Sequence, residues 1–228
     1  MTGSEADARA EGRREAAPAA LITLLGYVAL AGVSWAEGWD IVGLPWWVWL
    51  LVALPVLLLT VDLAMSSRGA GLVRSREAAL VLLGLLVLGN VAALVILVAG
   101  LVTTKASNLG GGELLLTGFS IWSANVMVFA LAFWEVDADG PAARSRAGPR
   151  AGADFQFPQD QDGQQDGKVW KPQLWDYAYV SLTNSIAFSP TDTMPLTLRA
   201  KAMMGAESAI SAITILLVAA RAVNILGS

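Results

Sequence analysis

Cysteine and histidine are both absent from this chain of 228 residues. Without them the protein has no disulfides, no thiolate or imidazole metal ligands, no cysteine nucleophile and no histidine general base. No other nucleophile motif is recognisable, so we do not expect an enzyme, and we expect neither a metal nor a cofactor. The one catalytic hypothesis left open is a pair of carboxylates drawn from Asp62, Glu135, Asp176, Asp192 and Glu207.

Charged residues are also scarce. Only 15% of the residues are charged and 55% are hydrophobic, whereas soluble domains average about 25% and about 45 to 50%. The chain has 15 basic and 19 acidic side chains, too weak a basic balance for nucleic-acid binding. This composition predicts an integral membrane protein whose partner is the lipid bilayer. No nucleic acid is expected, and a homo-oligomer is left open.

Long apolar stretches follow one another along most of the chain. A helix needs about 20 apolar residues to cross a hydrocarbon core about 30 Å thick. The stretches that meet this length are residues 19–36, 44–65, 78–102, 114–134 and 200–226. They predict an all-α fold, a polytopic membrane helix bundle. A polar N-terminal tail, residues 1–18, is expected to be disordered, and residues 19–136 form a four-span membrane region.

Residues 137–171 have a different composition, rich in Gly, Pro, Gln and Asp with few apolar residues. This pattern predicts a polar cytoplasmic loop and not a domain. Phe155, Phe157 and Pro158 are its lipophilic residues, and we expect them to tie the loop to the membrane face or to the bundle.

Residues 172–228 are predicted to form a C-terminal hairpin, with a short polar helix, an SPTDTMP turn and the last span. Residues 174–188 would give about 22 Å of helix at about 1.5 Å per residue, too short and too polar for an easy span. This helix either crosses inside the bundle as a sixth span or re-enters on the side from which it came. The prediction is therefore five or six spans.

The distribution of Lys and Arg predicts the orientation. With the N-terminus inside, eleven basic residues of the first four spans and the loop lie in the cytoplasm and only Lys105 lies outside. We therefore expect a multi-pass protein of the cell (inner) membrane with a cytoplasmic N-terminus. The eleven are Arg9, Arg13, Arg14, Arg68, Arg74, Arg76, Arg144, Arg146, Arg150, Lys168 and Lys171.

Three strings in the C-terminal half carry a family resemblance. They are IWSANVMVFALAFWEVDADGPAAR, FQFPQ and WKPQLWDYAYVSLTNSIAFSPTDTMPLTLRAKAM, the last leading into RAVNIL. From Ile121 onward the chain resembles a bacterial family of multi-pass membrane proteins of unassigned function with a C-terminal FSPTDTMPL motif. The resemblance implies a membrane protein and names no reaction.

The same hairpin has a distant likeness to the two-helix pore module of channels. Residues 176–188 would be the pore helix, residues 189–195 the polar turn, and the last span the inner helix. A potassium filter needs glycines so that successive carbonyls can face the axis, and there is none from Val169 through Met204. The alternative is simple capping, in which Ser189 is an N-cap, Pro190 the first helical residue, and Pro195 opens the last helix.

Polar residues on the hairpin and the last helix are the candidate site. Glu207, Ser211, Thr214 and Arg221 share one helical face, and ionisable groups inside spans are functional hypotheses by default. Asn90, Ser123, Asn125 and Asn184 are predicted to form interhelical hydrogen bonds. The functional hypothesis is a polar path for an ion or small solute, and the alternative is a structural or interaction protein without transport. The residues expected to face a shared path or form the hairpin are Asp176, Thr183, Asn184, Ser189, Asp192 and Glu207.

Overall fold

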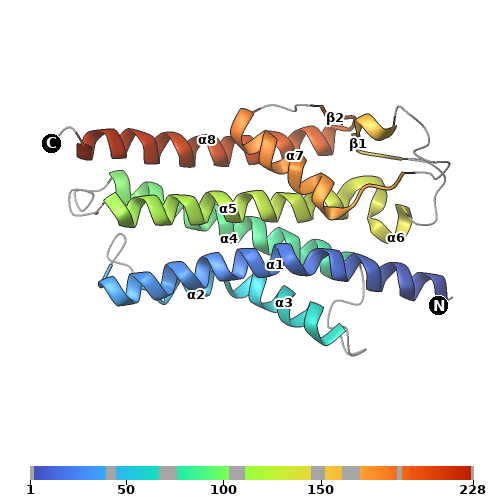
Figure 1. The fold of residues 1–228 in the computed structure, drawn as a ribbon, viewed down its shortest axis with the longest axis horizontal. Helices are drawn as coiled ribbons and strands as arrows, with labels where there is room; N and C mark the ends of the chain where they lie inside the picture. Colours follow the sequence, from blue (N-terminus) through green and yellow to red (C-terminus); the bar gives the residue numbers. More distant parts are fainter. Residues whose placement is uncertain are drawn as a thin grey trace.

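The computed structural model describes residues 3–39, 45–66, 76–102, 111–144, 152–160, 170–188 and 192–226. These residues form an all-α bundle, as predicted, with one two-stranded sheet at one end (Figure 1). Its α-helices are α1 Gly3–Glu37, α2 Val48–Val52, α3 Leu54–Ser66, α4 Arg76–Val102, α5 Gly111–Val136, α6 Pro141–Arg144, α7 Leu174–Ala187 and α8 Leu198–Leu226. Two 3-10 turns, Asp137–Asp139 and Pro158–Asp160, and strands β1 Phe155–Gln156 and β2 Met194–Pro195 complete the order.

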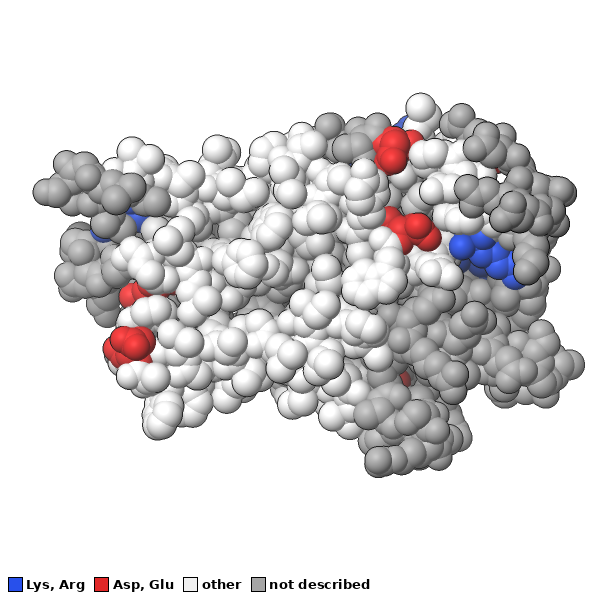
Figure 2. All heavy atoms as spheres, viewed as in Figure 1, with Lys and Arg blue, Asp and Glu red and all other residues white. Residues whose placement is uncertain are grey.

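Among the described residues, four helical segments are long and apolar enough to cross a membrane: Ala17–Glu37, Glu77–Val102, Gly111–Asp139 and Leu198–Arg221. Large apolar side chains lie on their outer faces, with Val81, Leu88 and Phe119 each more than 60% exposed. Figure 2 shows a broad uncharged band between two ends where the charged side chains of this face gather. Four such helices are compatible with a transmembrane protein.

The N-terminal segment differs from the prediction. Helix α1 begins at Gly3 and continues without a break to Glu37, so the expectation of a disordered tail is wrong for residues 3–18. The physical reason is composition, because this segment is dominated by Ala, Glu and Arg, which are strong helix formers even where they are polar.

The predicted second span is broken in two. Helices α2 and α3 meet at Ala53, whose N–H still bonds to the Trp49 carbonyl at 3.0 Å, while Leu57 N–H bonds to the Ala53 carbonyl at 2.9 Å. Pro55 lies between these bonds and has no N–H, so the helical pattern is interrupted at this point. The two helices continue in one general direction (Figure 1).

Helix α5 is the centre of the bundle and packs against α1, α4, α7 and α8. In α5 67% of the span is buried, against 28% to 39% in the other three candidate spans. A close approach to α8 contributes, because a Cβ on Gly118 would lie 2.4 Å from Val218 Cγ2. Polar side chains on α5 are therefore positioned to contact several helices at once.

Helix α7 leaves one end of the bundle and the chain after it returns to the same end (Figure 1). Strand β1, before α7, pairs antiparallel with β2, after it, with Phe155 opposite Pro195. The Leu196 N–H also bonds to the Asp154 carbonyl at 2.7 Å. We call this end, where α6 and the two strands lie, the loop end. The opposite end, where α8 ends, is the far end.

The beginning of α8 corrects the capping hypothesis. Pro195 does not open the last helix but belongs to β2, and α8 begins at Leu198. Thr197 is the capping residue, since its Oγ1 accepts a hydrogen bond from the Ala200 N–H at 3.3 Å. Ser189 and Pro190 lie outside the described residues. The pairing of β1 with β2 outcompetes an earlier helix start because it satisfies backbone groups on both segments.

We predict that Gly118→Leu destabilises the protein while Gly84→Leu does not. A side chain at Gly118 would overlap Val218, whereas a Cβ on Gly84 meets nothing within 4 Å. Overpacking of this kind costs about 1–3 kcal/mol, and both variants gain the same helix propensity. Thermal unfolding in detergent measures the difference. Equal unfolding temperatures for the two variants would show that the α5–α8 approach is not tight.

Candidate functional site

Glu207 is buried in the middle of the bundle. It lies nine residues after the start of α8, or about 14 Å along the helix axis, and its exposed fraction is 0%. Helices α5 and α7 both pack against α8. A carboxyl group in such a place must obtain all its hydrogen bonds from neighbouring helices.

Two side chains of α7 contact the Glu207 carboxyl group. Asn184 Nδ2 donates to Glu207 Oε2 at 2.7 Å, and Ser181 Oγ is in hydrogen-bond contact with Glu207 Oε1. Ser181 and Asn184 are three residues apart and therefore share one face of α7. Asn184 also donates to the Met204 carbonyl at 3.0 Å, and its Oδ1 accepts a bond from Ser208 Oγ at 3.1 Å. We call Ser181, Asn184, Glu207 and Ser208 the Glu207 cluster.

The hydroxyl of Ser181 determines the protonation state that this geometry fits. Ser181 Oγ lies 2.7 Å from the carbonyl oxygen of Val126 as well as in contact with Glu207 Oε1. A serine hydroxyl has one proton to donate, and a carbonyl oxygen can only accept it. Both contacts are hydrogen bonds when Ser181 donates to Val126 and Glu207 donates to Ser181. The arrangement therefore fits a Glu207 side chain that carries its proton.

In the described part of the chain, no basic side chain compensates a charge at this position. Among the residues that the structure describes, Glu207 forms no ion pair with Lys or Arg. An ionised carboxylate would then be buried with only hydroxyl and amide neighbours, which is costly even on mild insertion scales. The absence of a basic partner among the described residues and the two hydrogen bonds of Ser181 therefore both fit a protonated Glu207.

A chain of polar side chains extends from the Glu207 cluster across the bundle. Asn125 Nδ2, on α5, donates to Ser211 Oγ at 2.8 Å and to the Glu207 carbonyl at 3.2 Å. Asn125 Oδ1 accepts from Asn90 Nδ2 on α4 at 2.8 Å, and Asn90 Oδ1 accepts from Tyr27 OH on α1 at 3.2 Å. We call this chain the buried network. It joins α1, α4, α5 and α8, and the Glu207 cluster adds α7.

The structure brings together only part of the predicted site. Asn184 and Glu207 meet, as described above. Asp176 instead accepts a bond from the Gln173 N–H at 2.7 Å at the start of α7, and Thr183 Oγ1 bonds to the Tyr179 carbonyl of its own helix at 2.9 Å. Asp192 is exposed near β2, and Ser189 lies outside the described residues. A path shared by all six residues is therefore not what the described part of the chain forms.

Other sequence predictions about polar side chains hold. On α8, Glu207, Ser211 and Thr214 are all buried, while Arg221 is half-buried near the far end. The hydrogen bonding predicted among Asn90, Ser123, Asn125 and Asn184 is confirmed for Asn90 with Asn125, and Asn184 joins them through Glu207. For Ser123 it stays a prediction. Tyr27 and Ser181 were missed as members. Sequence signals for them were weak, because a single Tyr or Ser inside a span is common.

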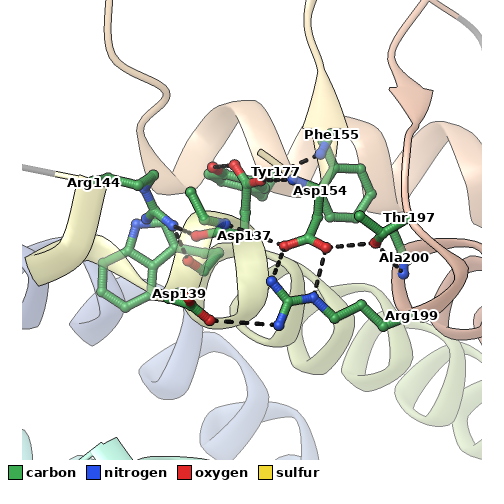
Figure 3. Close-up of polar contacts among 11 residues, drawn as sticks. Asp137, Asp139, Arg144, Asp154, Phe155, Tyr177, Thr197, Arg199 and Ala200 are labelled. Atoms are coloured by element: carbon green, nitrogen blue, oxygen red, sulfur yellow. Dashed lines mark hydrogen bonds and ion pairs between the residues drawn. The ribbon is translucent and has the colours of Figure 1, made fainter. Parts of the chain in front are cut away.

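A second polar group lies at the loop end, where α5 stops (Figure 3). Ala138 and Asp139 have positive φ angles of 49° and 62° and Gly140 follows at 95°, so the chain turns sharply. Asp137 holds this turn to the loop, since its Oδ1 accepts the Asp154 and Phe155 N–H groups at 2.6 and 3.2 Å. Its Oδ2 accepts Tyr177 OH at 2.5 Å, which ties α7 to the same turn.

Asp154 binds the start of α8 to this turn. Its carboxylate accepts two bonds from the Arg199 guanidinium, at 2.6 and 2.5 Å, and one from Thr197 Oγ1 at 2.5 Å (Figure 3). Burial alone would raise the pKa of Asp154, but the hydrogen bonds from Arg199 and Thr197, the Arg199 charge and a bond from the Ala138 N–H lower the pKa below its ordinary value. Arg199 also forms an outer ion pair with Asp139 at 3.5 Å.

Arg144 and four aromatic rings complete this region. Arg144 Nη1 donates to the Trp134 and Asp137 carbonyls, each at 2.6 Å, and so satisfies the C-terminal end of α5. Phe155 and Phe157 are buried against Phe133 and Tyr177, with ring centroids 5.1 and 5.3 Å apart in these two pairs. The predicted attachment of the loop to the bundle is confirmed for both phenylalanines, while Pro158 is exposed.

We call Asp137, Asp139, Asp154, Tyr177, Thr197 and Arg199 the loop-end cluster. None of its members was a predicted site residue. The available signal was that all of them lie in or next to the three strings that carry the family resemblance.

Comparison of the chain with protein-family models, curated proteins and solved structures yields no match. The resemblance in the C-terminal half therefore stays a prediction. In the described part of the chain, no group of three or more acidic residues is arranged to hold a metal ion. The site must be interpreted from its own geometry.

We predict that Asp154→Asn lowers stability at neutral pH by about 1–3 kcal/mol, since two charge-assisted bonds to Arg199 are weakened. Because the pKa of Asp154 is lowered on folding, its contribution is present above about pH 3.9 and is lost as the pH falls through the folded-state pKa. Melting temperatures measured from pH 7 to pH 3 should therefore converge for the wild type and Asp154→Asn.

The matched control is Asp139→Asn, which removes an outer ion pair between half-exposed side chains. Such pairs contribute about 0–1 kcal/mol, so this variant should melt close to the wild type at every pH. A difference in melting temperature between the wild type and Asp154→Asn that stays constant down to pH 3 would contradict the role given to Asp154.

Proposed function

We propose that this is a multi-pass protein of the cell membrane with a cytoplasmic N-terminus, and that Glu207 binds a proton inside the membrane as part of a path for protons. The proposal rests on the contacts of the Ser181 hydroxyl with the Val126 carbonyl and with the Glu207 carboxyl group. Ser181 has one proton to donate, so both contacts are hydrogen bonds when Glu207 donates its own proton to Ser181. The rest of the molecule supplies the buried environment.

The proposed topology has five spans and one re-entrant helix. The spans are α1, α2 with α3, α4, α5 and α8, and α7 enters from the cytoplasmic side and returns. The pairing of β1 with β2 supports this arrangement, because it brings the segments before and after α7 to one end. Charge supports it too, since Arg199 and Lys201 then join the cytoplasmic set and only Lys105 and Arg221 lie outside.

We predict that Met194→Cys reacts with a membrane-impermeant thiol reagent only from the cytoplasm. Met194 is exposed on β2, and the chain has no native cysteine to interfere. Lys171→Cys, in the loop, should label from the same side, and Glu37→Cys, at the end of α1, from the opposite side. Labelling of Met194→Cys together with Glu37→Cys would instead establish a sixth span.

A proton suits the Glu207 cluster better than a metal cation does. The two carboxyl oxygens of Glu207 contact the Asn184 amide and the Ser181 hydroxyl. A bound cation would require the Asn184 amide to turn away from Glu207, because an N–H group cannot face a positive ion. A proton needs no rearrangement, since the two contacts of the Ser181 hydroxyl already fit a protonated Glu207.

The alternative is a purely structural network. Asn90 and Asn125 have partners on both ends of their amide groups and could serve only to fix the packing of four helices. Hydrogen bonds of this type between spans average about 0.6 kcal/mol and are common as interhelical contacts. The two functions predict different effects on proton flux when Glu207 is replaced by an amide.

We predict that Glu207→Gln abolishes proton flux without unfolding the protein. A glutamine side chain supplies one donor to Ser181 and one acceptor to Asn184, as the neutral acid does, but it does not titrate. Purified protein is reconstituted in liposomes that contain a trapped pH-sensitive dye, and a potassium gradient with valinomycin drives proton uptake. The wild type should acidify the lumen faster than protein-free liposomes, and Glu207→Gln should not.

The control variant is Asp192→Asn, which makes the same chemical change at an exposed position away from Glu207. Its flux should equal that of the wild type. If the wild type itself is no faster than protein-free liposomes, or if Glu207→Gln conducts like the wild type, the structural alternative replaces the proton proposal.

A further inference from the structure

Two buried hydroxyl groups in the far half of the bundle are not satisfied by neighbouring side chains or carbonyls. Ser34 on α1 is 1% exposed and Thr117 on α5 is 0% exposed. Within the described part of the chain, neither Ser34 Oγ nor Thr117 Oγ1 has a hydrogen-bond partner. Leaving such a group without a partner costs about 1–3 kcal/mol, so each requires a physical explanation.

Other helical threonines of this chain show the ordinary solution. Thr23, Thr60 and Thr214 each donate to the carbonyl four residues earlier, at 2.9, 2.8 and 2.8 Å. Ser34 and Thr117 lie inside α1 and α5 and have carbonyls at the same spacing, yet their hydroxyls do not use them.

Helix geometry places both hydroxyls at one depth. Tyr27 and Asn125 are joined through Asn90 and so lie at a similar level. Ser34 is seven residues beyond Tyr27, or about 10 Å toward the far end, and Thr117 is eight residues before Asn125, or about 12 Å in the same direction. The two displacements agree because α1 and α5 run in opposite directions (Figure 1) and pack together.

Further polar groups mark the way from this level to the far end. Glu113, one turn beyond Thr117 on α5, is buried, and its carboxyl group stands in the first turn of the helix. Ser120 is a further buried hydroxyl residue of the same face of α5 as Glu113 and Thr117. Polar groups thus occur at successive turns from the far end of α5 to the level of Asn125.

We infer that bound water between α1 and α5, held by Ser34 and Thr117, connects the far end of the bundle with the buried network. Buried water is the usual partner of hydroxyls that side chains leave unsatisfied, and it requires two to four polar groups around it. Ser34, Thr117 and Glu113 supply such groups. The inference rests on the proposed function only for the purpose of this water. Asn125 contacts Asn90, Ser211 and the Glu207 carbonyl, and Ser211 is one helical turn from Glu207.

The test uses single cysteines at Ser34 and Thr117 in the otherwise cysteine-free chain. Both replacements are close in size to the native residues. A small, charged methanethiosulfonate reagent is added from the far side of sealed proteoliposomes that contain the full-length protein. Ala130→Cys is the matched control, because Ala130 is equally buried on α5 but lies on the loop-end side of Asn125.

We predict that Thr117→Cys and Ser34→Cys react from the far side and that Ala130→Cys does not. If both cysteines are as unreactive as Ala130→Cys, the water site is wrong. Hydroxyl-radical footprinting of the wild type provides a readout without substitutions. The inference is also wrong if the segments that contain Ser34 and Thr117 are as strongly protected from the radical as the segment that contains Ala130.

The outcome is independent of the proton proposal. Reactive cysteines together with unchanged flux in Glu207→Gln would keep the water site and end the proton function. Unreactive cysteines together with flux that depends on Glu207 would end the water site and keep the function.

Discussion

The contact of Glu207 with Ser181 and Asn184 is the interaction on which the arrangement of the C-terminal half depends. Helix α7 is short and carries several polar residues, so it cannot be stable on an apolar surface by itself. Its polar face is satisfied because Glu207, the Met204 carbonyl and the Val126 carbonyl are directed toward it. The Glu207 side chain in turn needs α7, since no basic residue in the described structure pairs with it. Each element supplies what the other lacks.

The loop-end cluster holds the chain segments before and after α7 at one end of the bundle. A helix that enters the bundle and does not leave at the far end must be followed by chain that comes back. Asp154 receives that returning chain, through its carbonyl to Leu196 and through its carboxylate to Thr197 and Arg199. Asp137 joins the same region to Tyr177 at the beginning of α7. The two ends of the α7 hairpin are thereby held to the C-terminal end of α5, while Glu207 holds its middle.

Much of this architecture follows from local sequence. Apolar length predicts α1, α4, α5 and α8 as spans, and the extent of α7 agrees with the predicted short polar helix. The polar stripe of α8 follows from helical period alone. What local sequence cannot supply is the set of contacts between residues far apart, such as Asp137 with Tyr177 or Asp154 with Arg199, which are 40 and 45 residues apart. The expectation that Pro195 opens the last helix failed for the same reason, because a helix start is a local pattern and the strand pairing that holds Pro195 is not.

The chemical identity of residue 207 distinguishes the two functions more sharply than its contacts do. Where this bundle needs a buried side chain that both donates and accepts, it uses asparagine, at positions 90, 125 and 184. A glutamine at position 207 could make the same two contacts with Ser181 and Asn184 at no risk of burying a charge. A carboxyl group in this position matches the pattern only while it holds a proton, so it ties the packing of α7 to proton occupancy. Packing alone does not call for that dependence, whereas a site that takes up and releases protons requires it.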